Sequence, residues 1–413
     1  MTVQIGEKMN KNKVNVPKIR FPGFTDPWEQ RTVGEWGSFY YGHSCPKWSV
    51  TEDATTPCIR YGELYTKFGT KIDRVFSYTN MPTDKLRFSK GTEVLIPRVG
   101  EDPMDYNHCT WLSVPGIAIG EMISVYNTEQ NPLFTATMFN ARLQKEFASK
   151  VEGGSVTNLY YEKLKNINVL FPSLTEQEKI AAYFEQIDYL ITLHQRKLNH
   201  LQDKKKGLLQ KMFPNNGEKF PELRFPGFTD PWEQRKFSEL FIERREKTKT
   251  EYEDTLLSCA IEGMFLNSEL FSHFRGSTTI GYLKVKKNDL ILSAQNLHLG
   301  NANVNLRFES GIISPAYKVY NLNNCNPYFI NAWVKKDSTK NFFLMATTEG
   351  ASQCRKNIEW NILNNQLINV PKIEEQIKIG GYFNELDNLI TLHQRKLEHL
   401  QQQKKGLLQQ MFI

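Results

Sequence analysis

The sequence has no apolar run of about 18 residues, the length that a helix needs to cross a membrane. Its first residues, Met1 to Val14, are polar and lysine-rich without an apolar core, so they do not resemble a secretory signal. The six cysteines are scattered and form no C-x-x-C pair, which argues against a structural zinc site and a disulfide scaffold. These absences favour a reduced, cytoplasmic protein without a membrane segment.

Familiar catalytic motifs are missing as well. The chain has no P-loop, no H-E-x-x-H, no G-x-S-x-G and no cysteine–histidine cluster at metal spacing. Two segments, Asn131–Phe134 and Asn326–Phe329, resemble the short motif that grips the target base in adenine methyltransferases, but their third residue is not proline and no glycine-rich loop precedes them. A helix cap explains both, because Asn is favoured at the N-cap and Pro at the first helical position. We therefore expect no catalytic residue and no metal site in this chain.

The composition is that of a folded, multidomain protein. At 413 residues the chain is too long for one ordinary domain, and its 40% hydrophobic and 12% aromatic residues suffice for packed cores. Lys and Arg number 52 against 45 Asp and Glu, a net charge of +7 that weakly favours a polyanionic partner.

A tandem duplication organises the chain. The twelve residues RFPGFTDPWEQR occupy Arg20–Arg31 and recur at Arg224–Arg235, and the eight residues ITLHQRKL occupy both Ile191–Leu198 and Ile390–Leu397. The segments between these flanks match only faintly, for example KGTEVLIP from Lys90 against KKNDLILS from Lys286. We infer one fold in two copies that carry two different surfaces.

The near-identical flanks predict two long helices. Apolar positions from Ile180 to Met212 and from Ile379 to Met411 recur in alternating steps of four and three residues, the pattern of a coiled coil. Thr175 with Glu178 offers a capping box at the start of the first helix. Each helix of at least 33 residues would span roughly 50 Å. We predict that the two helices pair in an antiparallel coiled coil with a pseudo-twofold axis; pairing between two chains is the alternative.

Twelve residues define the expected seam of this coiled coil: Phe184, Ile187, Ile191, His194, Leu198, Leu201, Phe383, Leu386, Ile390, His393, Leu397 and Leu400. The histidines among them are interpreted as polar seam residues that fix the register, with metal binding as the less favoured alternative.

Strand and helix signals alternate in the two middle segments, 32–170 and 236–369, which indicates a mixed α/β (α+β) domain in each. Helices are expected over Leu133–Lys150 and Tyr328–Phe343. The predicted organisation is an N-terminal arm (1–17), a first domain (18–172), a first spacer helix (173–213), a linker (214–223), a second domain (224–371) and a second spacer helix (372–413).

Basic, aromatic and amide residues on predicted loops are candidates for DNA contacts, since Arg suits guanine edges, Gln and Asn suit adenine edges and Lys suits phosphates. Arg98 and the pair Gln295 and Asn296 stand out, because they follow corresponding strands of the two copies with different side chains. The candidates in full are Arg60, Tyr61, Lys67, Arg87, Lys90, Arg98, Arg275, Lys284, Lys286, Lys287, Gln295, Asn296, Arg307, Gln353, Arg355 and Lys356.

Taken together, the chain resembles the specificity subunit (S, or HsdS) of type I restriction–modification systems over nearly its whole length. The resemblance rests on the duplicated FPGFTDPWE segments, the helix starts LTEQEKI (Leu174–Ile180) and IEEQIKI (Ile373–Ile379), the long helices and the two divergent domains. Ile373 is a minor departure, because the pattern has leucine there.

The resemblance implies two target recognition domains, each of which reads one half of an asymmetric, bipartite site on double-stranded DNA. It implies that the coiled coil sets the spacing and docks two modification subunits, which methylate adenine N6 with S-adenosylmethionine, and that restriction subunits join them with ATP and Mg. The chain itself would be a non-catalytic reader without a cofactor. Two alternatives are a protein-only scaffold, with two protein-binding domains on a coiled coil, and an enzyme.

Overall fold

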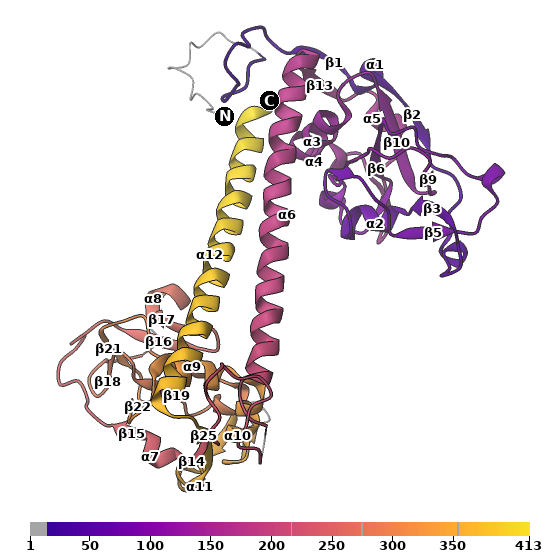
Figure 1. The fold of residues 1–413 in the computed structure, drawn as a ribbon. Helices are drawn as coiled ribbons and strands as arrows, with labels where there is room; N and C mark the ends of the chain where they lie inside the picture. Colours follow the sequence, from indigo (N-terminus) through magenta and orange to yellow (C-terminus); the bar gives the residue numbers. More distant parts are fainter. Residues whose placement is uncertain (1–14, 216, 274–275, 353–354) are drawn as a thin grey trace. The chain divides into compact units, whose positions relative to one another are not determined.

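The structure is a computed structural model that describes residues 15–215, 217–273, 276–352 and 355–413 (Figure 1). The chain divides into two compact units, Met1–Leu193 with Leu397–Ile413, and His194–Lys396. Each unit holds one globular domain and a stretch of both long helices, so the units are described in turn. No helix in the described part of the chain is long and apolar enough to cross a membrane.

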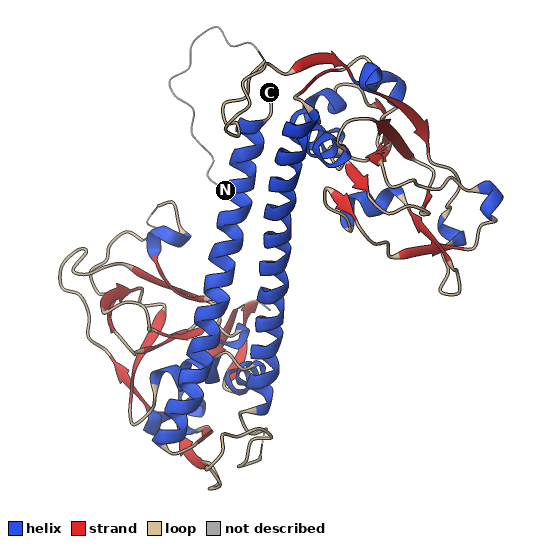
Figure 2. Cartoon of the chain, turned by 45° about the horizontal axis from the view of Figure 1, so that its top comes forward, coloured by secondary structure: helices blue, strands red, loops and turns tan. Residues whose placement is uncertain are grey.

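The first globular domain mixes short helices and strands (Figure 2). Its main sheet has the order β2-β10-β6-β8-β4, and smaller sheets have the orders β5-β3-β9, β11-β12-β7 and β1-β13. The elements are β1 (Glu29–Thr32), α1 (Val33–Trp36), β2 (Gly37–Tyr41), β3 (Thr56–Ile59), α2 (Tyr61–Thr66), β4 (Lys71–Ile72), β5 (Ser77–Thr79), β6 (Glu93–Pro97), β7 (Val99–Gly100), β8 (Thr110–Leu112), β9 (Ala118–Ile119), β10 (Ile123–Thr128), α3 (Pro132–Arg142), α4 (Gln144–Ala148), β11 (Glu152–Gly153), β12 (Thr157–Asn158), α5 (Tyr161–Leu164) and β13 (Asn168–Phe171).

The second globular domain repeats this plan with a smaller main sheet of order β15-β22-β19-β20. Its β14-β25 pair corresponds to β1-β13, and β15, β22 and β19 correspond to β2, β10 and β6. The elements are β14 (Glu233–Lys236), α7 (Phe237–Leu240), β15 (Phe241–Arg244), β16 (Leu257–Ala260), β17 (Gly263–Leu266), α8 (Asn267–Leu270), β18 (Leu283–Lys286), β19 (Leu290–Ser293), β20 (Ala302–Val304), β21 (Ser310–Ile313), β22 (Tyr317–Leu322), α9 (Pro327–Val334), α10 (Asp337–Leu344), β23 (Thr347–Ser352), β24 (Arg355–Ile358), α11 (Trp360–Asn365) and β25 (Leu367–Val370).

The two Asn-Pro segments are helix starts. The Asn131 side chain accepts a hydrogen bond from the Phe134 backbone N–H at 2.9 Å, and Asn326 does the same for Phe329 at 3.0 Å. The predicted single helices after them are wrong, because each breaks into two: α3 and α4 meet at Leu143, and α9 and α10 are separated by two lysines. The break lets a second short helix turn its own apolar residue, Phe147 or Phe343, into the core.

The two long helices are α6 (Leu174–Lys211) and α12 (Ile373–Met411). The predicted capping box at Thr175 is wrong, because α6 begins one residue earlier and the N–H groups of Glu176 and Gln177 bond to the Ser173 carbonyl instead. Serine after the helix-incompatible Pro172 is itself a favoured N-cap, which explains the shift.

The helices pair within the chain and run antiparallel in each unit. In the first unit Lys404 forms an ion pair with Asp188, and in the second unit Lys205 forms one with Asp387. From the first ion pair to the second, the residue number on α6 rises from 188 to 205, while that on α12 falls from 404 to 387. The two ion pairs occupy equivalent positions of the repeat. The predicted antiparallel coiled coil within one chain is confirmed.

The structure places the twelve seam positions on the inner faces of these helices. Seven of them are buried, namely Phe184, Ile187, Leu198, Phe383, Leu386, Leu397 and Leu400, while Ile191, Leu201, Ile390 and the two histidines are half-buried. Met411, in the same stripe at the end of α12, is buried as well. His194 and His393 face each other with their Nδ1 atoms 2.8 Å apart.

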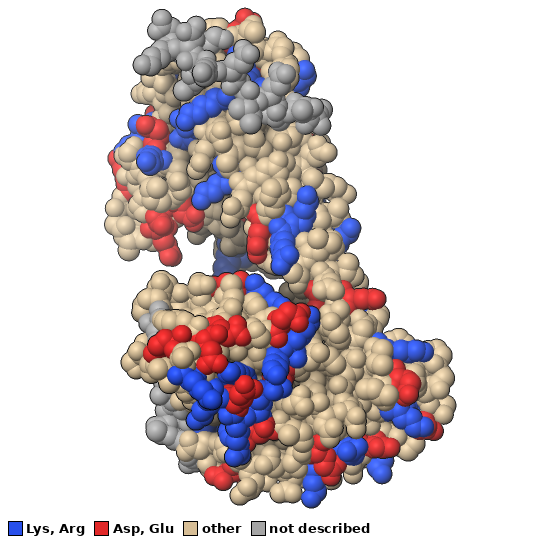
Figure 3. Space-filling view, turned by 90° about the vertical axis from the view of Figure 1, so that its left-hand side faces the viewer, with Lys and Arg blue, Asp and Glu red and all other residues tan. Residues whose placement is uncertain are grey.

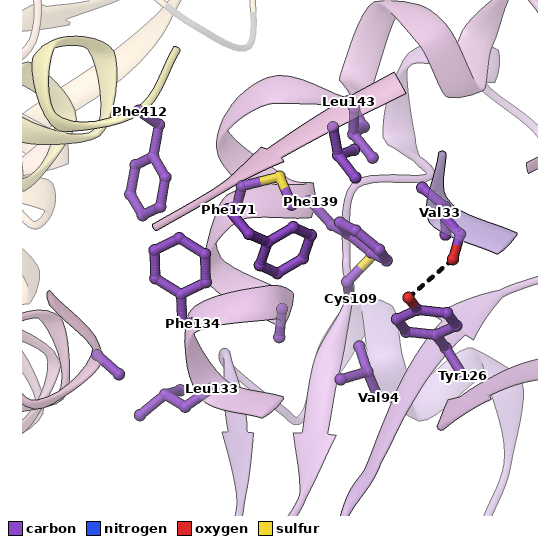
Figure 4. Packing of buried hydrophobic residues seen from close by; sticks show 14 of the residues in the cluster. Val33, Val94, Cys109, Tyr126, Leu133, Phe134, Phe139, Leu143, Phe171 and Phe412 are labelled. Atoms are coloured by element: carbon purple, nitrogen blue, oxygen red, sulfur yellow. Dashed lines mark hydrogen bonds between the residues drawn. The ribbon is translucent and has the colours of Figure 1, made fainter. Parts of the chain in front are cut away.

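A phenylalanine beside the end of each long helix anchors a globular domain. Phe412 is 2% exposed and packs against Trp28, Phe134 and Phe184 in the first unit. Figure 4 shows the Phe412 ring beside that of Phe134. Its counterpart Phe213 is likewise 2% exposed and packs against three equivalent rings, Trp232, Phe329 and Phe383. The tryptophans belong to the twelve-residue repeats, so each repeat ties its domain to the helix that ends beside it.

The same repeats hold the start of the other helix in each unit. Arg20 forms a two-pronged ion pair with Glu176, with both N···O distances 2.7 Å, and Arg224 pairs identically with Glu375. The glutamates are 0% and 1% exposed. The repeats therefore brace the ends of the coiled coil within the chain.

The glutamines of the two helix-start motifs complete this junction. The Gln177 side chain accepts from the Asn131 backbone N–H at 3.0 Å, and Gln376 accepts from the Asn326 backbone N–H at 2.9 Å. Each also donates to the carbonyl of the preceding proline. The Glu-Gln pair of each motif thus serves to join a globular domain to its helix.

Candidate nucleic-acid interface

The structure places Arg98 where three elements of the first domain meet. Tyr41 ends β2, Arg98 follows β6, and Tyr160 precedes α5; the guanidinium carbon of Arg98 lies 4.8 Å from the Tyr41 ring centre and 5.5 Å from that of Tyr160. We call these three residues the Arg98 shelf. No ion pair or side-chain hydrogen bond of Arg98 is found among the described residues, and its Nε is buried without a partner.

Arg87 lies beside the shelf and is exposed. Its Nη1 donates to the Tyr41 carbonyl at 2.7 Å, and its guanidinium lies 5.5 Å from the Tyr40 ring centre. Burial raises the pKa of Tyr40 and of Tyr41 to about 12, so both phenols stay neutral, and the contacts of the two arginines are with neutral rings. The structure thus brings two of the candidate arginines together on tyrosines.

The sequence reasoning missed these tyrosines. Tyr40 and Tyr41 end a strand whose counterpart in the repeat ends at Arg244 and is followed by Arg245, and only an alignment of the two faint copies could have shown that difference. No local sequence pattern marks Tyr160, because its contact with Arg98 depends on how the end of β6 packs beside the turn before α5.

The remaining first-domain candidates are spread around α2 and the turn before β6. Arg60 and Tyr61 begin α2, where the Arg60 N–H bonds to the Glu63 carboxylate at 3.0 Å. Lys67 lies 3.6 Å from the same carboxylate, and Lys90 is exposed. Lys67 and Arg74 also flank the ring of Phe76, which is 46% exposed and was not anticipated from the sequence.

The second domain presents basic side chains that acidic neighbours neutralise. Lys284 pairs with Glu246 and Glu253, Lys287 with Glu309, and Arg307 with Glu269. Figure 3 shows Lys and Arg interleaved with Asp and Glu on the face of this domain that it presents. These three candidates are therefore less available to a phosphate than their charge suggests.

The other second-domain candidates differ in their setting. Gln295 is exposed and Asn296 half-buried in the turn after β19, and no ion pair is found for Lys286 or Lys356 in the described part of the chain. Arg275 and Gln353 lie outside the described residues, as does the side chain of Arg355.

Position for position, the two domains carry opposite arrangements at the end of the main sheet. Arg98 corresponds to Ala294, and the tyrosines Tyr40 and Tyr41 correspond to Arg244 and Arg245. Those two arginines are paired with Asp289 and Glu243. One fold therefore presents an unpaired arginine on tyrosines in one copy and neutralised arginines in the other.

The long helices also expose a repeated apolar pair. Leu389 and Leu392 on α12 are 44% and 61% exposed, and their counterparts Leu190 and Leu193 on α6 are half-buried next to Tyr189, which is 65% exposed. None of these residues belongs to the predicted seam. An exposed apolar pair that recurs at equivalent positions of both helices is a candidate for a protein contact.

The histidine pair brings two titratable rings into contact in the coiled coil. Burial, followed by the neighbouring His393, lowers the pKa of His194. One ring nitrogen must donate and the other accept across the 2.8 Å contact, so at least one ring is neutral there. No group of three or more His, Cys, Asp or Glu side chains that could hold a metal ion is found among the described residues.

Comparisons with known proteins identify a domain that part of the chain matches and a solved structure with a similar fold. Residues 120–203 match the family model described as the type I restriction modification DNA specificity domain. The whole fold is similar to the crystal structure of the type I restriction-modification S subunit from M. genitalium, with 13% identity, a TM-score of 0.57, and coverage of 96% of this chain and 99% of that chain. Residues 120–203 therefore match the type I restriction modification DNA specificity domain, and the likeness to the S subunit shows that the chain shares its fold.

Two further solved structures match over most of the chain but have TM-scores too low to add to the argument. The HsdS subunit from Thermoanaerobacter tengcongensis is 15% identical, with coverage of 98% and 99% and a TM-score of 0.42. A chain from a structure that concerns complex assembly and conformational transition of the type I R-M system is 13% identical, with coverage of 92% of this chain and 96% of that chain and a TM-score of 0.46.

Proposed function

We propose that each globular domain reads one half of an asymmetric, bipartite DNA target, and that the coiled coil sets the distance between the two half-sites. One observation carries this proposal: two domains of the same fold are anchored to the helices by equivalent residues yet present different side chains at the end of the main sheet, Arg98 on tyrosines in one and Ala294 in the other. A constant scaffold with two unlike surfaces suits a target with two unlike halves.

We further propose that the chain acts without catalytic residues or a cofactor of its own. Two modification subunits would dock on the helices and methylate adenine N6 with S-adenosylmethionine, and restriction subunits with ATP and Mg would join them. The exposed leucine pair of α12 and its half-buried counterpart on α6 support two equivalent docking sites. An adenine must leave the base stack to be methylated, which costs a few kcal/mol, and the reader would hold the DNA for that step. The proposal places the chain in the cytoplasm with its DNA.

Mapping of N6-methyladenine in the source cell, with and without the chain, tests the proposal. Loss of one asymmetric, split motif upon deletion is the expected result. An unchanged methylation map in a cell that contains an active adenine methyltransferase partner would contradict it.

A protein-only scaffold is the second candidate, and the neutralised lysines and arginines of the second domain favour it. The two candidates differ in salt dependence, because a DNA reader that releases several counterions loses affinity steeply as salt rises. A scaffold would show a slope near zero in a plot of log affinity against log salt.

A further inference from the structure

Arg98 stands apart from the other cations over aromatic rings in the described part of the first domain because it lies over two rings. Arg31, Lys67 and Lys71 each lie over one ring and have a carboxylate partner: Glu29, Glu63 and Glu185. Arg74, Arg87 and Lys165 also lie over one ring each, with no ion pair among the described residues. Arg98 has two tyrosine rings and no carboxylate among the described residues. The rings hold the guanidinium in place without neutralising its charge, so it can still donate hydrogen bonds to a ligand.

The backbone fixes Arg98 before any ligand arrives. Its N–H donates to the Met122 carbonyl at 3.1 Å, and its carbonyl accepts from the Leu159 N–H at 2.8 Å. Tyr41 is paired in register with Ser124 of β10, and its hydroxyl donates to Glu162 at 3.0 Å. A guanidinium that lies over a ring held in this way loses little freedom when it binds, so its contact is both strong and selective.

The nitrogens of Arg98 that remain free to donate limit which base the side chain can contact. The buried Nε leaves the two Nη groups of the half-buried side chain as the available donors. A guanidinium has donors only, and in the major groove guanine offers two acceptors, O6 and N7, whereas adenine offers one acceptor beside a donor. A two-pronged contact of the Arg98 shelf therefore fits guanine.

We propose that Arg98 is a specificity-determining residue that reads a guanine in the half-site of the first domain, positioned by Tyr41 and Tyr160. The second domain has Ala294 at this place and reads its half-site by other side chains. This inference rests on the proposed DNA-reading function and assigns one base pair of one half-site to one residue.

The test uses the full chain in complex with its modification subunits. The methylation motif is first mapped in cells with the unaltered chain, and then with Arg98→Ala and Arg98→Lys. Arg98→Ala should make one G·C pair of a single half-site degenerate and leave the other half-site unchanged. In competition binding to duplexes that differ only at this pair, preference for guanine should fall by roughly 5- to 150-fold. Arg98→Lys keeps the charge but not the planar fork, so it should keep the affinity better than the preference.

Arg31→Ala is the matched control, because Arg31 also lies over a ring, Trp36, but is paired with Glu29. It should leave the motif unchanged. An unchanged motif with Arg98→Ala, degeneracy at an A·T pair, or a uniform loss of affinity without a change of preference (a phosphate contact) would each overturn the assignment. Loss of all methylation by both Arg98 variants would mark a structural role and overturn it as well. Absence of any split motif with the unaltered chain would instead refute the proposed function.

Discussion

At the scale of single residues, the buried ion pairs at the helix starts predict how much a single substitution destabilises the chain. Glu375→Ala would leave Arg224, which is 15% exposed, with a buried and uncompensated charge, and should lower the free energy of unfolding by about 3–5 kcal/mol. Lys372→Ala, at the same helix start, removes a pair whose side chains are 68% and 64% exposed and should cost only about 0–1 kcal/mol. Urea unfolding of both variants gives the comparison; equal effects would show that burial does not govern the pair.

The histidine pair predicts a pH dependence of stability. Because the pKa of His194 in the folded chain is below its ordinary value of 6.5, the unfolded chain binds a proton first as the pH falls, and stability decreases below about pH 6.5. His194→Leu with His393→Leu removes the titrating pair from the seam. Thermal unfolding at pH 7.5 and 5.5 should show a smaller difference for this double variant than for the unaltered chain. An undiminished difference would assign the effect to other groups.

At the scale of elements, the exposed leucines of α12 predict the docking of a partner. Leu389→Gln with Leu392→Gln keeps good helix formers on an exposed face, so it should weaken binding of the modification subunit without changing the unfolding of the chain. Ile377→Gln is the control, because Ile377 is 53% exposed on the same helix but corresponds to a glutamate, Glu178, in the repeat. Sedimentation of the mixed proteins measures the binding; equal effects of both changes would locate the contact elsewhere.

Elements were predictable where the pattern is long and repeated, and less so where tertiary contacts decide. The heptads of α6 and α12 specify both helices and their inner face, since every seam residue from Phe184 to Leu400 lies inward. The break at Leu143 could not be predicted, because it follows from the burial of Phe147 rather than from a local helix breaker. The Arg98 shelf could be predicted only in part: the arginine follows a recognisable strand, but the tyrosines come from β2 and from the turn before α5.

At the scale of the whole molecule, the repeat predicts that one domain can take the place of the other. Replacing residues 32–170 by residues 236–369 keeps the contact of Trp28 with Phe412 and the ion pair of Arg20 with Glu176, because all four residues lie outside the exchanged segment. Such a chain should direct methylation to a symmetric motif, in which the two half-sites form an inverted repeat. Methylation mapping checks this; retention of the original asymmetric motif would show that the exchanged segment does not carry the reading surface.

The junctions that hold the two domains also include a pair of backbone bonds. The Leu223 N–H donates to the Lys211 carbonyl at 2.8 Å, where the chain passes directly from helix to repeat, and the Ile19 N–H donates to the Gln410 carbonyl at 3.1 Å, where no peptide bond joins the two segments. The same joint thus forms with and without a covalent link between its halves. A joint of this kind needs no fixed order of segments along the chain, so either position can seat a globular domain of this fold through contacts that both positions share.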